Sequence, residues 1–132
     1  MQDDKEVIRQ FTTQWIAAVN TKDIPKLLSM VTEDVVFLPP GFPALRGKRS
    51  VEAMYNAFFP QFKSVEQTVV MEEVEVDGDW AFSWGTEKFV LVPEQGGPPV
   101  EMRSRGLSIL RRQPGGSWKF ARGITQPIQP ST

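Results

Sequence analysis

The first half of the chain carries apolar residues at helical spacing. The first such stripe consists of Val7, Phe11, Trp15 and Ala18. Asp3 lies just before the stripe, and Glu6 follows three residues later, which is the pattern of a capped helix start. Residues 20–22 then break the pattern with polar side chains. The sequence therefore predicts a first helix that begins at Asp3 and ends at this break.

Two further helices are predicted before the middle of the chain. Asp23 can cap the second helix, and Pro25 is tolerated in its first turn. The apolar stripe of this helix is Ile24, Leu27, Leu28 and Val31. Residues 35–38 form a strand-like run that prolines stop, and a loop continues to Gly47. The third helix is marked by Val51, Met54, Tyr55 and Phe58, and we expect Pro60 to end it.

The second half of the chain changes its period from helix to strand. Four runs rich in strand-forming residues span 66–76, 80–92, 100–112 and 117–125. Short segments rich in Gly, Pro and Asp separate them, so an antiparallel meander is predicted. Helices followed by strands indicate an α+β domain with the helices packed on one sheet face. We expect one domain over residues 1–132, because a chain of this length builds one core.

Glycines inside the predicted strands suggest a bent sheet. Gly85, Gly106 and Gly123 interrupt three of the runs, and such glycines mark bulges, bends or close approaches. A bent sheet can curl around the helices and leave a hollow. The alternative is a set of loosely formed strands with no cavity.

Both faces of the predicted sheet contain apolar side chains. One alternation carries Trp80, Phe82, Trp84, Leu107, Ile109, Trp118 and Phe120. The other carries Ala81, Ser83, Gly85, Phe89, Leu91, Ser108, Leu110 and Ala121. Helices in a chain this short can cover only one face, and large exposed apolar patches are rare. We therefore expect a homodimer through the face that holds Trp84 and Ile109.

The composition excludes several classes of function. The sequence has no His and no Cys, which removes Ser-His-Asp triads, thiolate catalysis and the commonest zinc ligands. No metal or other cofactor is expected. The net charge of −1, with both signs interspersed, argues against nucleic-acid binding. The sequence contains no apolar run long enough to span a membrane and no leader pattern, so we expect a cytoplasmic protein.

An ordered set of segments resembles a known superfamily. The segments are 15–20 with Asp23, 33–37, 46–47, 51–55, 78–82 with Gly85, and 111–119. Together they resemble ketosteroid-isomerase-like and SnoaL-like, polyketide-cyclase-like members of the nuclear transport factor 2-like superfamily. The resemblance implies a cone in which three helices close a strongly curved antiparallel sheet around a pocket. Members include isomerases, cyclases, epoxide hydrolases, dehydratases and binding domains, so the fold leaves the reaction open.

The residues that catalyse in ketosteroid isomerases are mostly replaced. Trp15 stands where the isomerases have a tyrosine, and Pro39 where they have an aspartate base. Ser108 stands in place of a protonated aspartic acid, and Gly123 where many relatives carry an aspartate. Tyr55 alone matches a pocket tyrosine. The resemblance implies that the ligand is lined by Trp15, Phe37, Met54, Tyr55, Phe58, Ser108 and Thr125.

Glu87 is the candidate catalytic residue. The family register places it on the pocket face, where partial burial would raise its pKa and suit a general base. The alternative is a rim position or an ion pair with Lys88 or an arginine, while Arg103 and Arg105 are expected on the outer face. The first hypothesis is a protein that binds a small apolar ligand without catalysis. The alternatives are a carboxylate-based isomerase, cyclase, lyase or hydrolase, and a structural dimerisation domain.

Overall fold

The computed structural model describes residues 3–128, and the ends of the predicted domain lie outside this range. The helices are α1 (Asp4–Asn20), α2 (Ile24–Ser29) and α3 (Lys48–Phe58), and the short 3-10 helix η1 (Phe59–Gln61) follows α3. The strands are β1 (Val31–Leu38), β2 (Leu45–Arg46), β3 (Phe62–Asp77), β4 (Trp80–Pro93), β5 (Val100–Arg112) and β6 (Trp118–Pro127). The three predicted helices and the four long strands are confirmed, and β2 is an additional short strand. Val31, which the apolar stripe assigned to the second helix, instead begins β1.

Local signals explain the helix boundaries. The Asp3 side chain accepts a hydrogen bond from the Lys5 backbone N–H and caps α1. Asp23 caps α2 in the same way, by accepting from the Lys26 N–H at 3.1 Å. α3 continues into η1 at Pro60, because a proline at that position can start a new turn but cannot continue an α-helix.

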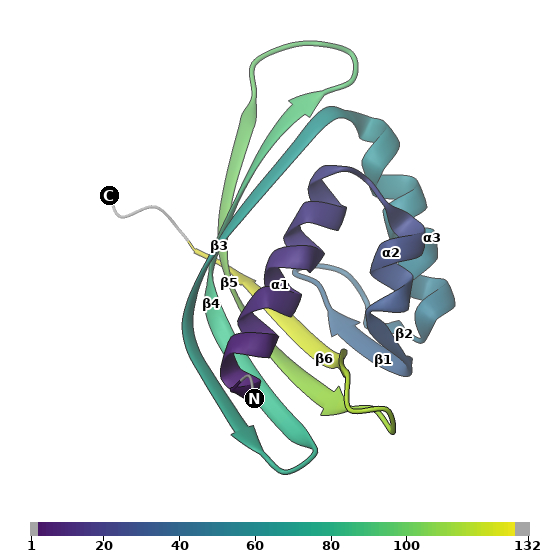
Figure 1. Cartoon of the computed structure of the whole chain (residues 1–132). Coiled ribbons are helices and arrows are strands. Elements are labelled where there is room, and N and C mark those ends of the chain that lie inside the picture. Colours follow the sequence, from purple (N-terminus) through teal and green to yellow (C-terminus); the bar gives the residue numbers. More distant parts are fainter. Residues whose placement is uncertain (1–2, 129–132) are drawn as a thin grey trace.

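All six strands form one sheet in the order β2-β1-β6-β5-β4-β3. Strands β3 to β6 pair antiparallel as the predicted meander. β1 runs parallel to β6. The sequence did not predict this pairing, because the short connections indicated only how the later strands pair with one another. The long strands bow around the helices, all of which lie on the concave side (Figure 1). This confirms the α+β cone with a curved sheet.

Bulges decide which residues face the helices. Between the pairs Ile109–Arg122 and Leu110–Phe120, Ala121 is an extra residue on β6. The extra residue reverses the alternation of β6, so Trp118 and Phe120 are buried in the core. The prediction that these two aromatics share the outer face with Trp84 and Ile109 is therefore wrong.

Gly85 lies opposite a second bulge, in β3 between Met71 and Glu73. A Cβ atom at Gly85 would collide with the Val70 carbonyl oxygen and lie 3.1 Å from the Met71 Cα. Both are backbone atoms that cannot move aside without shifting the strand. The glycine therefore permits the close approach of the two strands at this bend.

Candidate functional site

A cavity of about 350 Å³ lies between the helices and the concave face of the sheet. Its walls are mainly apolar, and they come from α1, α3, the end of β1 and the inner faces of β3 to β6. All eight predicted site residues line it, namely Trp15, Phe37, Met54, Tyr55, Phe58, Glu87, Ser108 and Thr125. The structure thus brings the predicted set together around one space, while the roles of these residues stay predictions.

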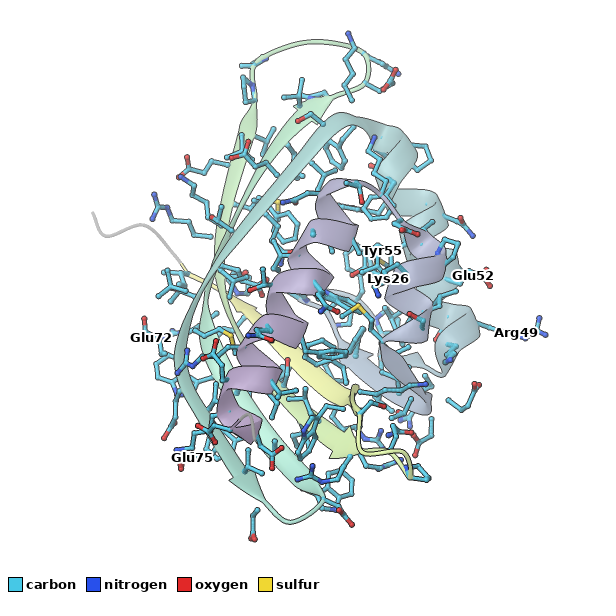
Figure 2. The ribbon with its side chains drawn as sticks, in the orientation of Figure 1. Lys26, Arg49, Glu52, Tyr55, Glu72 and Glu75 are labelled. Atoms are coloured by element: carbon cyan, nitrogen blue, oxygen red, sulfur yellow. The ribbon has the colours of Figure 1, made fainter. Side chains whose placement is uncertain are left out.

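Aromatic side chains from α1, α3, β1 and β4 line the cavity. Trp15 meets Phe37 and Tyr55 edge-on, with ring centroids 6.1 and 6.4 Å apart. Phe58 of α3 faces Phe89 of β4 across 6.4 Å. Rings in edge-to-face contact hold one another in place, so this wall is preorganised. Figure 2 shows Tyr55 on the side of α3 that faces α1, while Glu52 and Arg49 of the same helix point away.

Glycines on the sheet leave room for two of the lining side chains. A Cβ atom on Gly106 would stand 3.0 Å from the Glu87 Oε1 atom. A Cβ atom on Gly123 would stand 3.1 Å from the Cδ1 atom of Phe37. At both glycines, the space that a Cβ atom would fill is next to a side chain of the cavity wall. The missing side chains therefore allow these close approaches.

Glu87 is a partly buried carboxylate on the cavity wall. Its Oε2 atom accepts a hydrogen bond of 2.6 Å from the Gln67 Nε2 atom, and neither Lys88 nor an arginine pairs with it in the described part of the chain. Burial raises the pKa of the Glu87 carboxyl, and the hydrogen bond from Gln67 partly opposes that rise. Neither of the two alternatives for Glu87, a position at the sheet rim or an ion pair, fits this environment.

Gln67 is held in place from outside the cavity. The whole residue is only 5% exposed. The Asn20 Oδ1 atom accepts from the Gln67 backbone N–H at 2.7 Å, and the Asn20 Nδ2 atom donates to the Gln67 carbonyl at 3.2 Å. The end of α1 thereby fixes the strand segment that orients Glu87. Sequence reasoning did not select Gln67, although the buried residues Val65 and Gln67 share the inward alternation of β3.

Tyr55 contributes a hydroxyl group in an apolar setting. Burial, and secondarily the negative charge of Glu87, raises the pKa of Tyr55 above its ordinary value. The hydroxyl stays protonated at neutral pH and can donate a hydrogen bond. No residue within 3–128 forms a hydrogen bond with it.

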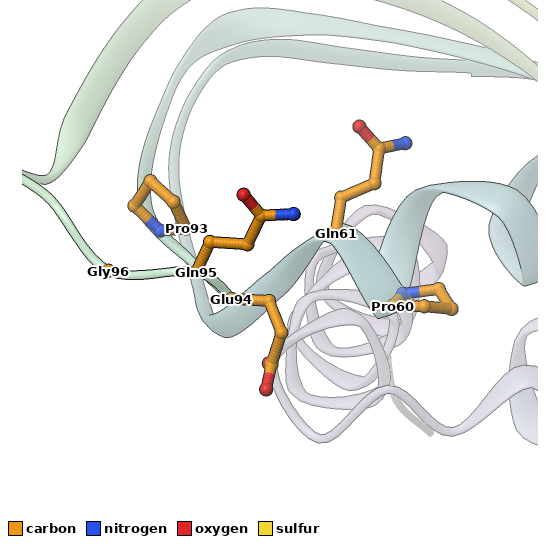
Figure 3. Close-up of a pocket in the computed structure, with 6 residues that line it drawn as sticks. All are labelled: Pro60, Gln61, Pro93, Glu94, Gln95 and Gly96. Atoms are coloured by element: carbon orange, nitrogen blue, oxygen red, sulfur yellow. The ribbon is translucent and has the colours of Figure 1, made fainter.

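A second depression lies at one end of the sheet (Figure 3). It is about 550 Å³ in volume and is lined by Pro60, Gln61, Pro93, Glu94, Gln95 and Gly96. Most of these residues are exposed, and the Glu94 carboxylate points away from the two glutamine amides (Figure 3). This arrangement brings no reactive groups together, so the inner cavity is the candidate functional site.

The sequence matches the SnoaL-like domain over residues 12–120. A conserved protein from Planctomyces limnophilus has 29% identity and a TM-score of 0.87, with 95% of this chain and 98% of the other covered. A ketosteroid isomerase-like protein from Erwinia carotovora has 28% identity and a TM-score of 0.85, with coverage of 98% and 100%. The hexachlorocyclohexane dehydrochlorinase LinA-type3 from Novosphingobium barchaimii has 16% identity and a TM-score of 0.83, with coverage of 96% and 87%, and shows the fold alone. A comparison with curated proteins gives no match.

The chain therefore belongs to the SnoaL-like domain family. Its fold is that of nuclear transport factor 2-like proteins, one of which, from Salmonella enterica, gives a TM-score of 0.87 at 13% identity. None of the helices between residues 3 and 128 combines the length and the apolar character that crossing a membrane requires.

Proposed function

We propose that this chain binds a compact, largely apolar small molecule in its inner cavity. The supporting observation is the cavity itself, which has a volume of about 350 Å³ and mainly apolar walls. Ligand pockets in proteins range from roughly 300 to 1,000 Å³, so the ligand is small. Edge-to-face contacts among aromatic residues favour a preformed site and reduce the entropy lost on binding.

Binding without catalysis is the first hypothesis, because most acids of the isomerases are missing. Trp15 can donate a hydrogen bond but cannot act as a phenolic acid. Pro39 and Gly123 line the cavity without any titratable group. Ser108 offers only a hydroxyl. These residues suit recognition of a ligand better than the family's usual proton transfer.

A cavity-filling substitution tests this function. We expect ligand-observed NMR to detect neutral aromatic alcohols, ketones or hydrocarbons bound to the wild-type protein. Ser108→Phe should abolish that signal, because the new ring would occupy the cavity that Ser108 lines. Ser64→Phe is the matched control, because Ser64 is exposed on β3. Absence of binding to the wild type, or equal binding to Ser108→Phe, would contradict the proposal.

A carboxylate-based enzyme is the second hypothesis, and the pair of Glu87 and Tyr55 supports it. A carboxyl with a raised pKa can accept a proton from a substrate, and a nearby phenol can donate to the oxygen that becomes negative. Such an isomerase, cyclase, lyase or hydrolase would use only this chain's side chains. Glu87→Gln should then lower turnover about a hundredfold or more while a neutral substrate still binds.

We also propose that two copies associate through the convex sheet face. Trp84 pairs with Leu107 and Phe82 with Ile109, which places these apolar residues side by side on adjacent strands. Trp84 is 36% and Ile109 37% exposed. Burial against a second copy would remove this apolar surface from water. Light scattering at tens of micromolar that gives the monomer mass would contradict this.

A further inference from the structure

The cavity contains hydrogen-bond acceptors that no protein donor satisfies. The Gln67 Oε1 atom is buried and has no partner among residues 3–128. Glu87 accepts from Gln67 at its Oε2 atom only, so its Oε1 atom is free on the side of Gly106. A buried polar atom without a partner destabilises the ligand-free protein. A ligand that donates hydrogen bonds at this point would offset that loss.

The negative charge of Glu87 also has no positively charged partner among the described residues. The ionisable residues that line the cavity are Tyr55, Glu87 and Arg103. Arg103 is turned outward, because its Nε atom bonds to Glu101 at 3.0 Å and its side chain is 63% exposed. No cation of the described chain therefore pairs with the Glu87 carboxylate. An ionised Glu87 calls for a positive charge from the ligand.

Two aromatic residues of the cavity wall, Phe89 and Tyr55, lie on the side of these acceptors. Phe89 is the cross-strand partner of Gln67 and lies two residues from Glu87 on the same face of β4. Tyr55 is close enough for the charge of Glu87 to raise its pKa. The faces of aromatic rings attract cations, and the attraction is strongest where water is excluded.

We propose that the ligand of this cavity is a compact hydrophobic amine, bound as its ammonium ion between the Glu87 carboxylate and the Gln67 amide oxygen. This proposal rests on the proposed function and names the class of ligand. A primary ammonium group has three donors and no acceptor, which suits two acceptor atoms that lack a protein donor. A neutral alcohol offers one donor and no charge, and Glu87 would repel an anionic ligand.

The experiment compares three probes of similar shape by isothermal titration calorimetry. The probes are 2-phenylethylamine, 2-phenylethanol and 3-phenylpropionate. One charge-assisted hydrogen bond is worth about 1.5–3 kcal/mol, so the wild type should prefer the amine to the alcohol by about tenfold or more. The carboxylate should bind most weakly.

Variants assign this preference to Glu87. Glu87→Gln keeps the side-chain shape, and it should remove the amine's advantage while leaving the alcohol's affinity nearly unchanged. Glu52→Gln is the matched control, because Glu52 points away from the cavity (Figure 2), and it should behave as the wild type. Circular dichroism of each variant checks that the fold is intact.

A second readout needs no variant. Burial raises the pKa of Glu87, and a bound ammonium ion favours the ionised carboxylate, so amine binding at a pH near the folded pKa should release a proton. Repeating the calorimetry in buffers with different ionisation enthalpies measures this release. The alcohol should release none.

The outcomes separate this inference from the proposed function. If 2-phenylethanol binds as tightly as the amine, or if Glu87→Gln keeps the amine preference, the amine proposal is overturned and the cavity remains a binding site for neutral molecules. If neither these probes nor the neutral panel bind, both proposals fail.

Discussion

Replacing Asn20 with alanine tests how the end of α1 supports the site. The side chain forms hydrogen bonds of 2.7 and 3.2 Å with both backbone groups of Gln67 on β3, which is an edge strand. Each such bond contributes about 1 kcal/mol, so their loss removes about 2 kcal/mol. Alanine regains about 0.5 kcal/mol through its better helix propensity. The free energy of unfolding should therefore fall by about 1.5 kcal/mol.

Urea denaturation followed by circular dichroism measures this difference. Asn56→Ala is the control, because Asn56 is exposed on α3 and undergoes the same chemical change. Asn20→Asp should fall between the two, because the carboxylate keeps an acceptor for the Gln67 N–H but loses the donor. If Asn20→Ala is as stable as Asn56→Ala, the two hydrogen bonds do not anchor β3.

Three further predictions concern the bend, the carboxyl and the convex face. Gly85→Ala should lower the free energy of unfolding, measured by urea denaturation, by more than about 2 kcal/mol, because the new Cβ atom would collide with backbone atoms of β3. Gly115→Ala is the control and should have little effect, because a Cβ atom at Gly115 would have no neighbour within 4 Å. The folded pKa of Glu87 lies above the unfolded value, so the wild type should lose stability as pH rises from the ordinary glutamate pKa through the folded one. Glu87→Gln should lack this loss of stability in urea titrations across that pH range. If the stability of the wild type and of Glu87→Gln depends on pH in the same way, the burial of Glu87 is refuted. Ile109→Glu should give a monomer by light scattering, and an unchanged dimer mass would place the interface elsewhere.

Periodicity predicted the parts of the fold that local sequence determines. The apolar stripes, the capping residues Asp3 and Asp23 and the turn residues between strands identified three helices and four long strands. Alternation alone left both faces of β4 open, and the family resemblance indicated which face lines the pocket. Because the pairing of β4 with β5 contains no bulge, that register holds as far as Glu87, which lines the cavity.

The remaining features depend on contacts between distant segments. One extra residue, Ala121, reverses the alternation of β6. The nearby Gly123 indicates an irregularity in this strand, but it does not show which residue is the extra one. The parallel pairing of β1 with β6 joins segments from opposite ends of the chain. Asn20 and Gln67 are 47 residues apart, so no local pattern could connect them. The Asn20 hydrogen bonds hold the backbone of Gln67, whose side chain bonds to Glu87.

The most direct test of the account is the pKa of Glu87, measured by carbon-detected NMR of the glutamate carboxyl groups across a pH titration. The spectrum of Glu87→Gln identifies the resonance of Glu87. We predict that this carboxyl titrates at higher pH than the exposed glutamates, because the cavity wall desolvates it. If Glu87 titrates together with the exposed glutamates, its carboxylate lies in bulk water, and the proposed site is contradicted.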